Sequence, residues 1–222
     1  MVWLRVVVQL PILLMAVSLD NMIQYAAFPH NKEGFVLLRV VLVVMLVGTG
    51  ISAQASSLDV ALSGDSARVG YIAPFRAGDF GLNQYEVGVL FTDRDDVVAS
   101  FGLRVSDEAG ADSPGLEVGL GLKAYAASAD NNGSLALGLG GEMHYLPPNL
   151  KRVGFGLFGY FAPNIVAFID SDKFYEWGAR LEYQVLPEAT LYLGYRNVEM
   201  GLNSGGSLNI DSGGHLGIKY GF

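Results

Sequence analysis

Residues 116–127 read LEVGLGLKAYAA, and this stretch decides the fold. Every second residue is large and apolar, and the residues between them are glycine or charged. The apolar positions are Leu116, Val118, Leu120 and Leu122, and the positions between them are Glu117, Gly119, Gly121 and Lys123. Side chains change faces at every residue of a strand. The stretch therefore predicts a β-strand with one apolar face and one face of glycine and charge.

The same alternation recurs along the chain from residue 58 onward, as in residues 135–145 and 177–185. It predicts ten strands, at residues 57–63, 67–73, 84–92, 97–106, 116–127, 134–146, 152–162, 174–186, 190–199 and 214–222. The first two are the weakest, because they depend on a turn at Gly64-Asp65 and on the need for an even number of strands. A barrel of eight strands, with this first hairpin lying elsewhere, is the alternative.

The lengths and ends of these strands favour a membrane over water. A tilted strand needs about 9–11 residues to cross a bilayer, and the predicted strands approach this length. Aromatic rings suit the membrane interface and gather near the strand ends, at Tyr71, Tyr85, Phe91, Tyr145, Phe161, Tyr183 and Tyr195. We therefore predict an all-β fold, a closed antiparallel transmembrane β-barrel in a bacterial outer membrane.

The connections give the barrel a direction. If the last strand runs toward the periplasm, the short turns at 147–151 and 186–189 lie on that side. Residues 164–173 and 202–213 then form longer outer loops. Outer-membrane barrels have short periplasmic turns and longer extracellular loops, so the arrangement is typical of them.

The first 55 residues are not expected to be part of the barrel. Arg39, the apolar run 40–47 and the small residues Ala53 and Ala55 have the layout of a signal peptide at 35–55, cleaved after Ala55. Residues 1–34 fit an over-extended start, with a genuine transmembrane helix as the alternative. The mature barrel is then residues 56–222.

Composition excludes several classes of protein. The chain has no cysteine, which excludes disulfides, thiolate metal sites and a cysteine nucleophile. Its formal net charge of -8 argues against nucleic acid as a partner. The acidic stretches 93–96 and 170–172 lack the spaced oxygens and the glycine of a calcium loop. We expect no metal and no cofactor.

Charged side chains on the glycine-rich face would point into the barrel. They are Glu86, Arg104, Glu117, Lys123, Glu142, His144, Arg180, Glu182, Arg196 and Lys219. Enclosed charges must pair or meet water, because an isolated buried charge costs several kcal/mol. We expect an ion-pair network that fills the lumen, with a narrow water-filled pore as the alternative. Glycines on the same face would leave room for the larger inward side chains.

The last strand ends with apolar residues at every second position. Leu216, Ile218, Tyr220 and Phe222 resemble the terminal signal that the barrel-assembly machinery recognises in bacterial outer-membrane proteins. This machinery and outer-membrane lipid are the expected partners.

Several segments of the mature chain resemble the YfaZ family of outer-membrane proteins. They are 58–60, 135–148, 160–163, 178–183 and 193–196. The resemblance spans nearly all of residues 56–222 and implies an outer-membrane barrel without an assigned catalytic residue.

Function is less well defined by the sequence. No serine or aspartate has a spacing that ties it to His144 or His215, so no enzymatic activity is expected. We predict a structural or minor passive-transport role. The alternatives are an outer-surface binding protein that uses loops 164–173 and 202–213, and a soluble periplasmic carrier of the lipocalin type. The sequence indicates no ligand and no oligomeric state.

Overall fold

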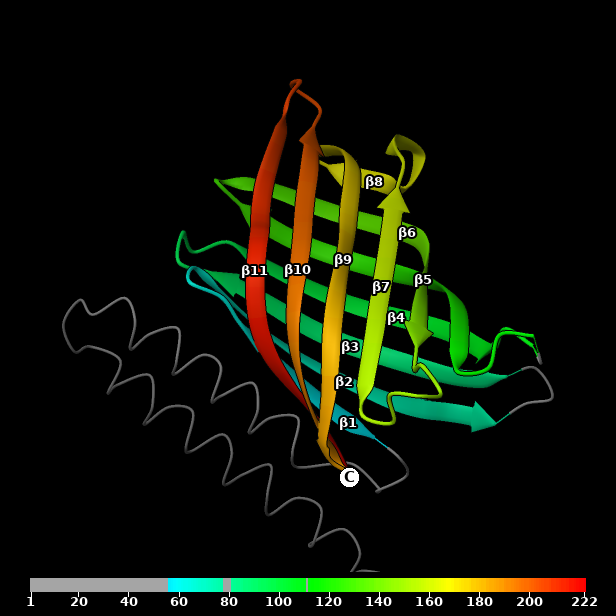
Figure 1. Ribbon diagram of the computed structural model, residues 1–222. Coiled ribbons are helices and arrows are strands. Elements are labelled where there is room, and N and C mark those ends of the chain that lie inside the picture. The colour runs from blue at the N-terminus through cyan, green and yellow to red at the C-terminus, as the bar shows by residue number, and fades with distance from the viewer. Residues whose placement is uncertain (1–55, 78–80, 111) are drawn as a thin grey trace, which may run out of the picture. The chain divides into compact units, whose positions relative to one another are not determined.

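The computed structural model describes residues 56–77, 81–110 and 112–222 (Figure 1). Its strands are β1 (Ser57–Leu62), β2 (Ser66–Ala77), β3 (Leu82–Thr92), β4 (Val97–Glu108), β5 (Leu116–Ala129), β6 (Asn132–Tyr145), β7 (Val153–Ala162), β8 (Ala167–Ile169), β9 (Ser171–Leu186), β10 (Ala189–Leu202) and β11 (Ser207–Gly221). A 3₁₀ turn, η1 (Asn164–Val166), precedes β8. No helix within these ranges has the length and apolar character to cross a membrane. The predicted start at 1–34 and signal peptide at 35–55 lie outside the described residues.

The strands close into one antiparallel barrel. Successive strands pair with each other, except that β7 pairs with β9 rather than with the short β8, and β1 pairs with β11 from Ser57↔Gly221 to Leu62↔Leu216. The short β8 pairs with residues 134–136 of β6, and residues 139–145 of β6 pair with β7. Ten strands of the described chain therefore build the wall, as predicted. The eight-stranded alternative is wrong, because β1 lies between β2 and β11.

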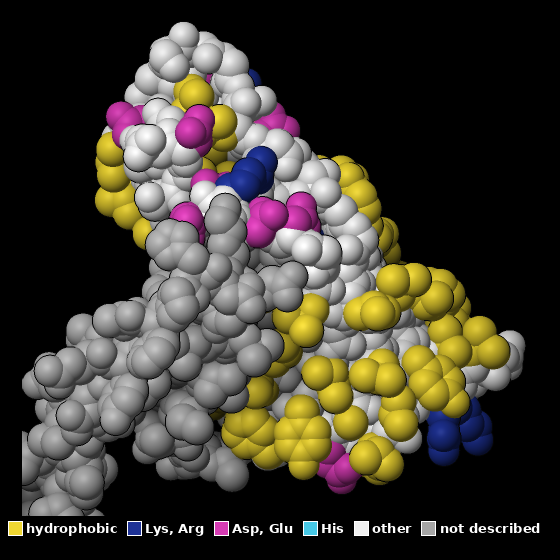
Figure 2. Space-filling view, turned by 90° about the vertical axis from the view of Figure 1, so that its left-hand side faces the viewer, with side chains coloured by type: hydrophobic (Ala, Val, Ile, Leu, Met, Phe, Trp, Pro, Cys, Tyr) yellow, Lys and Arg dark blue, Asp and Glu magenta, His cyan; other side chains and the backbone are white. Residues whose placement is uncertain are grey.

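The apolar faces of the strands point outward and the charged faces point inward. Leu120 is 74% exposed and Leu139 66%, whereas Lys123 and Arg196 are buried. Figure 2 shows hydrophobic side chains gathered over the visible wall. A lipocalin-like carrier would have the opposite arrangement, with its apolar side chains around a ligand inside.

Glycine lets strands and rings approach closely at two inward positions. A Cβ atom on Gly140 would lie 2.1 Å from the carbonyl oxygen of Gly159 on β7, and one on Gly217 would lie 2.2 Å from the Tyr192 ring. These distances agree with the expectation that glycine makes room inside the barrel.

The two loops that the sequence predicts to be long are largely ordered strand. Strand β9 already begins at Ser171 and β11 at Ser207, so only residues 203–206 connect β10 to β11. The polar residues of 207–213 suggest a loop by composition, but they continue to pair with β10 as far as Gly201↔Ser207. Cross-strand hydrogen bonding has overridden the local preference.

Candidate functional site

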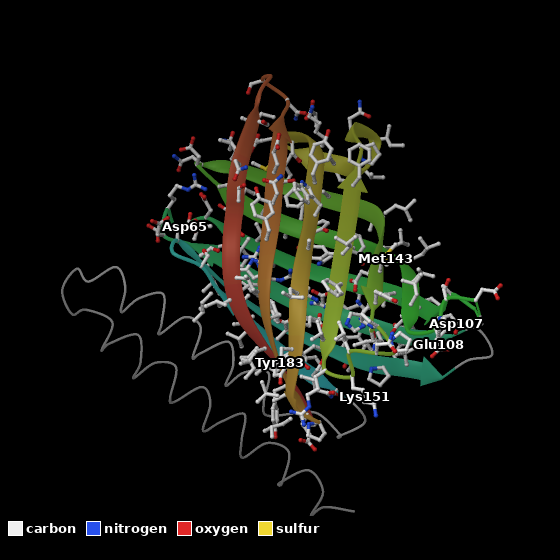
Figure 3. All side chains as sticks on the ribbon, viewed as in Figure 1. Asp65, Asp107, Glu108, Met143, Lys151 and Tyr183 are labelled. Carbon is white, nitrogen blue, oxygen red and sulfur yellow. The ribbon has the colours of Figure 1, made fainter. Side chains whose placement is uncertain are left out.

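The lumen is the candidate functional site, and the chain topology defines its two ends. The turn between β1 and β2 lies at what we call the hairpin end, where Figure 3 labels Asp65. The opposite, termini end carries Ser56 and Phe222, whose backbones pair at 3.1 Å, and the loop of Lys151.

A closed circuit of four charges crosses the middle of the lumen, and we call it the ion-pair ring. It consists of Arg68 on β2, Glu86 on β3, Lys123 on β5 and Glu176 on β9. Arg68 lies 2.5 Å from Glu86 and 3.1 Å from Glu176, and Lys123 lies 3.5 Å and 2.9 Å from the same two carboxylates. Each cation contacts both carboxylates. Because two cations face two carboxylates, the ring has no net charge.

The ring joins walls that are distant along the barrel circumference. Glu176 brings β9 into contact with β2 and β5, and it also accepts a hydrogen bond of 2.7 Å from the Tyr125 hydroxyl. Lys123 and Glu176 are 3% and 5% exposed. Buried charges that are fully paired and hydrogen-bonded hold one geometry, and loss of one partner leaves the others uncompensated.

Apolar side chains fill the lumen between the ring and the hairpin end, and we call them the apolar plug. Its main members are Leu90, Val98, Phe174, Val198, Met200 and Ile210. Phe174 and Met200 have no exposed surface, and the Phe174 ring centre lies 4.5 Å from that of Tyr125. Ala167 and Val166, at β8 and η1, pack against the same cluster. The plug therefore closes the lumen at the hairpin end.

The plug departs from the ion-pair network that the sequence analysis expected to fill the lumen. Inward positions near the hairpin end alternate just as the charged ones do, but they carry apolar residues, as at Val198 and Met200 on β10. The sequence does contain a signal for these apolar residues. Val198 and Met200 follow Arg196 at intervals of two, so they lie on the same inward face of the strand.

The lumen between the ring and the termini end is hollow, and we call this part the vestibule. A cavity of about 130 Å³ opens here, lined by residues that include Arg104, Glu117, Glu182 and Lys219. A deeper cavity of about 60 Å³ reaches the ring and shares Arg104 with the first. Exposure falls from 29% at His144 to 3% at Lys123, so the vestibule is open toward the termini end.

Five of the ten predicted lumen residues form ion pairs in the vestibule. Arg104 pairs with Glu142 and also donates to Gln84. Arg180 pairs with Glu182, which also lies 2.9 Å from His144 Nε2.

The other five predicted residues lie in different surroundings. Glu86 and Lys123 belong to the ion-pair ring, and Arg196 forms a separate buried pair with Asp211 at 2.6 Å. Glu117 accepts a hydrogen bond of 2.5 Å from the Ser106 hydroxyl. Lys219 has no carboxylate within 4.0 Å among the described residues.

Sequence reasoning missed four charged partners in the lumen, namely Asp59, Arg68, Glu176 and Asp211. Asp59 lies 3.7 Å from Arg180 and accepts a hydrogen bond from the Tyr192 hydroxyl. Glu176 precedes the outward Trp177 and alternates with it, so the same period of two could have located it.

The histidines do not form a nucleophile arrangement in the described part of the chain. His144 contacts Glu182, and His215 lies at mid-strand with its ring 5.8 Å from that of Tyr192. The Ser100 hydroxyl lies 3.5 Å from the Gly88 carbonyl oxygen. No group of three His, Asp or Glu side chains within residues 56–77, 81–110 and 112–222 could hold a metal ion.

The predicted assembly signal lies on the outer face of β11. Leu216, Ile218, Tyr220 and Phe222 are 42–66% exposed, and the last two rings stack with centres 6.4 Å apart. Recognition of this strand by assembly machinery stays a prediction.

Comparison with known proteins identifies the family. No curated protein sequence matches the chain. One solved structure, from a study of the in-meso crystallization of membrane proteins, is 13% identical, with 76% of this chain and 83% of that chain covered and a TM-score of 0.40. The outer membrane channel DcaP of Acinetobacter baumannii is 12% identical, with 77% and 60% covered and a TM-score of 0.38. The family model described as YfaZ precursor matches residues 36–222. The chain therefore belongs to the YfaZ family.

Proposed function

We propose that the protein is a structural β-barrel of the outer membrane whose lumen does not conduct in the closed form described above. The apolar plug carries this proposal. Phe174 and Met200 have no exposed surface, and a hydrated ion would have to displace them to pass. Below them, the ion-pair ring leaves no uncompensated charge that would attract an ion.

Two features of the outer surface support the membrane location. The outward side chains form an apolar band, in which Leu120 and Leu193 are 74% and 57% exposed. Tyr175 and Tyr183 on β9 bound this band, about 20 Å apart along the membrane normal at roughly 3.3 Å per residue and a tilt of about 40°. Outer-membrane barrels have a band of about 25 Å flanked by aromatic rings.

Planar-bilayer recordings test the closed lumen. The purified protein should insert without stepwise conductance across repeated experiments, whereas a matched insertion of a known porin should conduct. Regular unitary steps from the unmodified protein would contradict the proposal and favour passive transport. Membrane fractionation and heat-dependent migration on a denaturing gel test the location and the barrel.

The proposed role is non-enzymatic. Outer-loop binding, one of the two alternatives from the sequence, has less loop surface than expected, because β9 starts at Ser171 and β11 at Ser207.

A further inference from the structure

Two charged side chains that line the vestibule lack an ionic partner, and they carry opposite charges. Lys219 on β11 has no carboxylate within 4.0 Å, and Glu117 on β5 has no cation within that distance, among the described residues. Their neighbours on the same cavity wall are paired, Arg104 with Glu142 and Arg180 with Glu182. The free cation and the free anion therefore face one shared space of about 130 Å³.

The space is suited to a small polar solute. A single water molecule needs about 10–15 Å³ by the same measure, so the cavity is roughly ten times larger than that minimum. Its wall also holds Arg104, whose guanidinium is already engaged by Glu142 and Gln84. A carboxylate close to Lys219 would give this lysine an anionic partner at contact distance.

We propose that the vestibule binds a small zwitterion, a solute of the amino acid class that enters from the termini end. Its carboxylate contacts Lys219 and its ammonium group contacts Glu117. Asp59 lies opposite Lys219 in the strand register but contacts Arg180, which it shares with Glu182. A zwitterion would give Lys219 and Glu117 each a partner at contact distance without changing the net charge of the lumen. A simple anion or a simple cation would leave one of the two uncompensated, so it binds more weakly.

This site is independent of conduction, because the apolar plug lies beyond the ring and the solute need not pass it. Binding is therefore measured on the full protein, purified in detergent from the membrane fraction. Isothermal titration with glycine, β-alanine and γ-aminobutyrate reports affinity as the distance between the two charges grows. Acetate and methylammonium are the single-charge probes. We expect at least one zwitterion to bind more tightly than either single-charge probe.

The variants Glu117→Gln and Lys219→Met each remove one free charge. Each should lower the affinity for the zwitterion by roughly tenfold or more, since a charge-assisted hydrogen bond is lost. The matched controls are Glu188→Gln and Lys151→Gln, which remove the same charges from exposed positions that do not line the cavity. Both controls should bind as the unmodified protein does.

Exchanging the two charges, Glu117→Lys with Lys219→Glu, should recover most of the affinity, because the zwitterion can bind in the reversed direction. Heat-dependent gel migration checks that every variant keeps a folded barrel. The proposal is overturned if zwitterions and single-charge probes bind alike, if nothing binds at tens of millimolar, or if the exchanged variant stays as weak as the single ones. A conducting lumen in bilayers would contradict the closed barrel and leave this binding result unaffected.

Discussion

Glu176→Gln is the substitution that tests the ion-pair ring most directly. Glu176 forms ion pairs with Arg68 at 3.1 Å and with Lys123 at 2.9 Å, and it accepts a hydrogen bond of 2.7 Å from the Tyr125 hydroxyl. Its side chain is 5% exposed. The neutral amide keeps the shape but leaves two cations with only Glu86 as an anionic partner. Removal of one member of a buried ion pair costs about 3–5 kcal/mol. The amide can still accept hydrogen bonds, so we expect the lower end, about 3 kcal/mol.

The assay is equilibrium unfolding in urea, in detergent micelles, followed by tryptophan fluorescence and by gel migration. Glu188→Gln removes the same charge from an exposed turn and should change the free energy of unfolding by less than about 0.5 kcal/mol. Removing a cation together with the anion, as in Glu176→Gln with Lys123→Met, restores neutrality. The loss in free energy of unfolding of the double variant should be smaller than the sum of the losses of the two single variants, by about 1–3 kcal/mol. A Glu176→Gln protein as stable as the Glu188→Gln control would refute the reasoning about the ring.

Other substitutions test the rest of the barrel. Gly140→Ala should destabilise the fold by about 1–3 kcal/mol in the same unfolding assay, because its Cβ would lie 2.1 Å from a β7 carbonyl oxygen. Gly213→Ala, whose Cβ would meet nothing within 4 Å, should be close to neutral, and equal effects would contradict the packing argument. Met200→Ala should cost about 2–5 kcal/mol by opening a cavity in the plug; a loss under about 1 kcal/mol would indicate that the plug is loosely packed. Leu120→Lys should cost about 2–4 kcal/mol in lipid vesicles, and an unchanged unfolding midpoint there would argue against contact between this position and lipid.

The wall of the barrel could be predicted well from the sequence, because a strand with one lipid-facing side leaves a period of two that survives in every segment. Residues 118–129 of β5 alternate between exposed and buried, and residues 118–123 alternate in step between apolar side chains and glycine or lysine. Strand ends were harder to place. The segment 207–213 is mostly Ser, Asn, Asp and Gly, so its composition suggests a loop, and its pairing with β10 identifies it as strand.

The composition of the lumen was predicted less completely than its wall. Membership of the inward face follows from the alternation of side chains along a strand, and the sequence analysis assigned Lys123 and Glu142 to that face on this basis. Pairing depends on how strands that are distant in sequence face each other across the lumen, as Lys123 faces Glu176. The period of two carries no information about those distances. The plug was missed for a related reason, because an apolar residue on the inward face looks like an interruption of the pattern until several strands are superposed.

The seam between β1 and β11 has a consequence for how the barrel folds. Each hairpin of the wall joins neighbours in sequence, whereas the contact of Ser57 with Gly221 joins the two ends of the described chain. Loop-closure entropy rises with the length of chain between two contacts, so this pairing is the slowest to form and gains nothing from local turns. Until it forms, β1 and β11 are both open edges that could pair with a neighbouring molecule. Pairing of β1 with β11 removes both open edges. It is therefore the folding step after which the barrel can no longer add a strand from a neighbouring molecule.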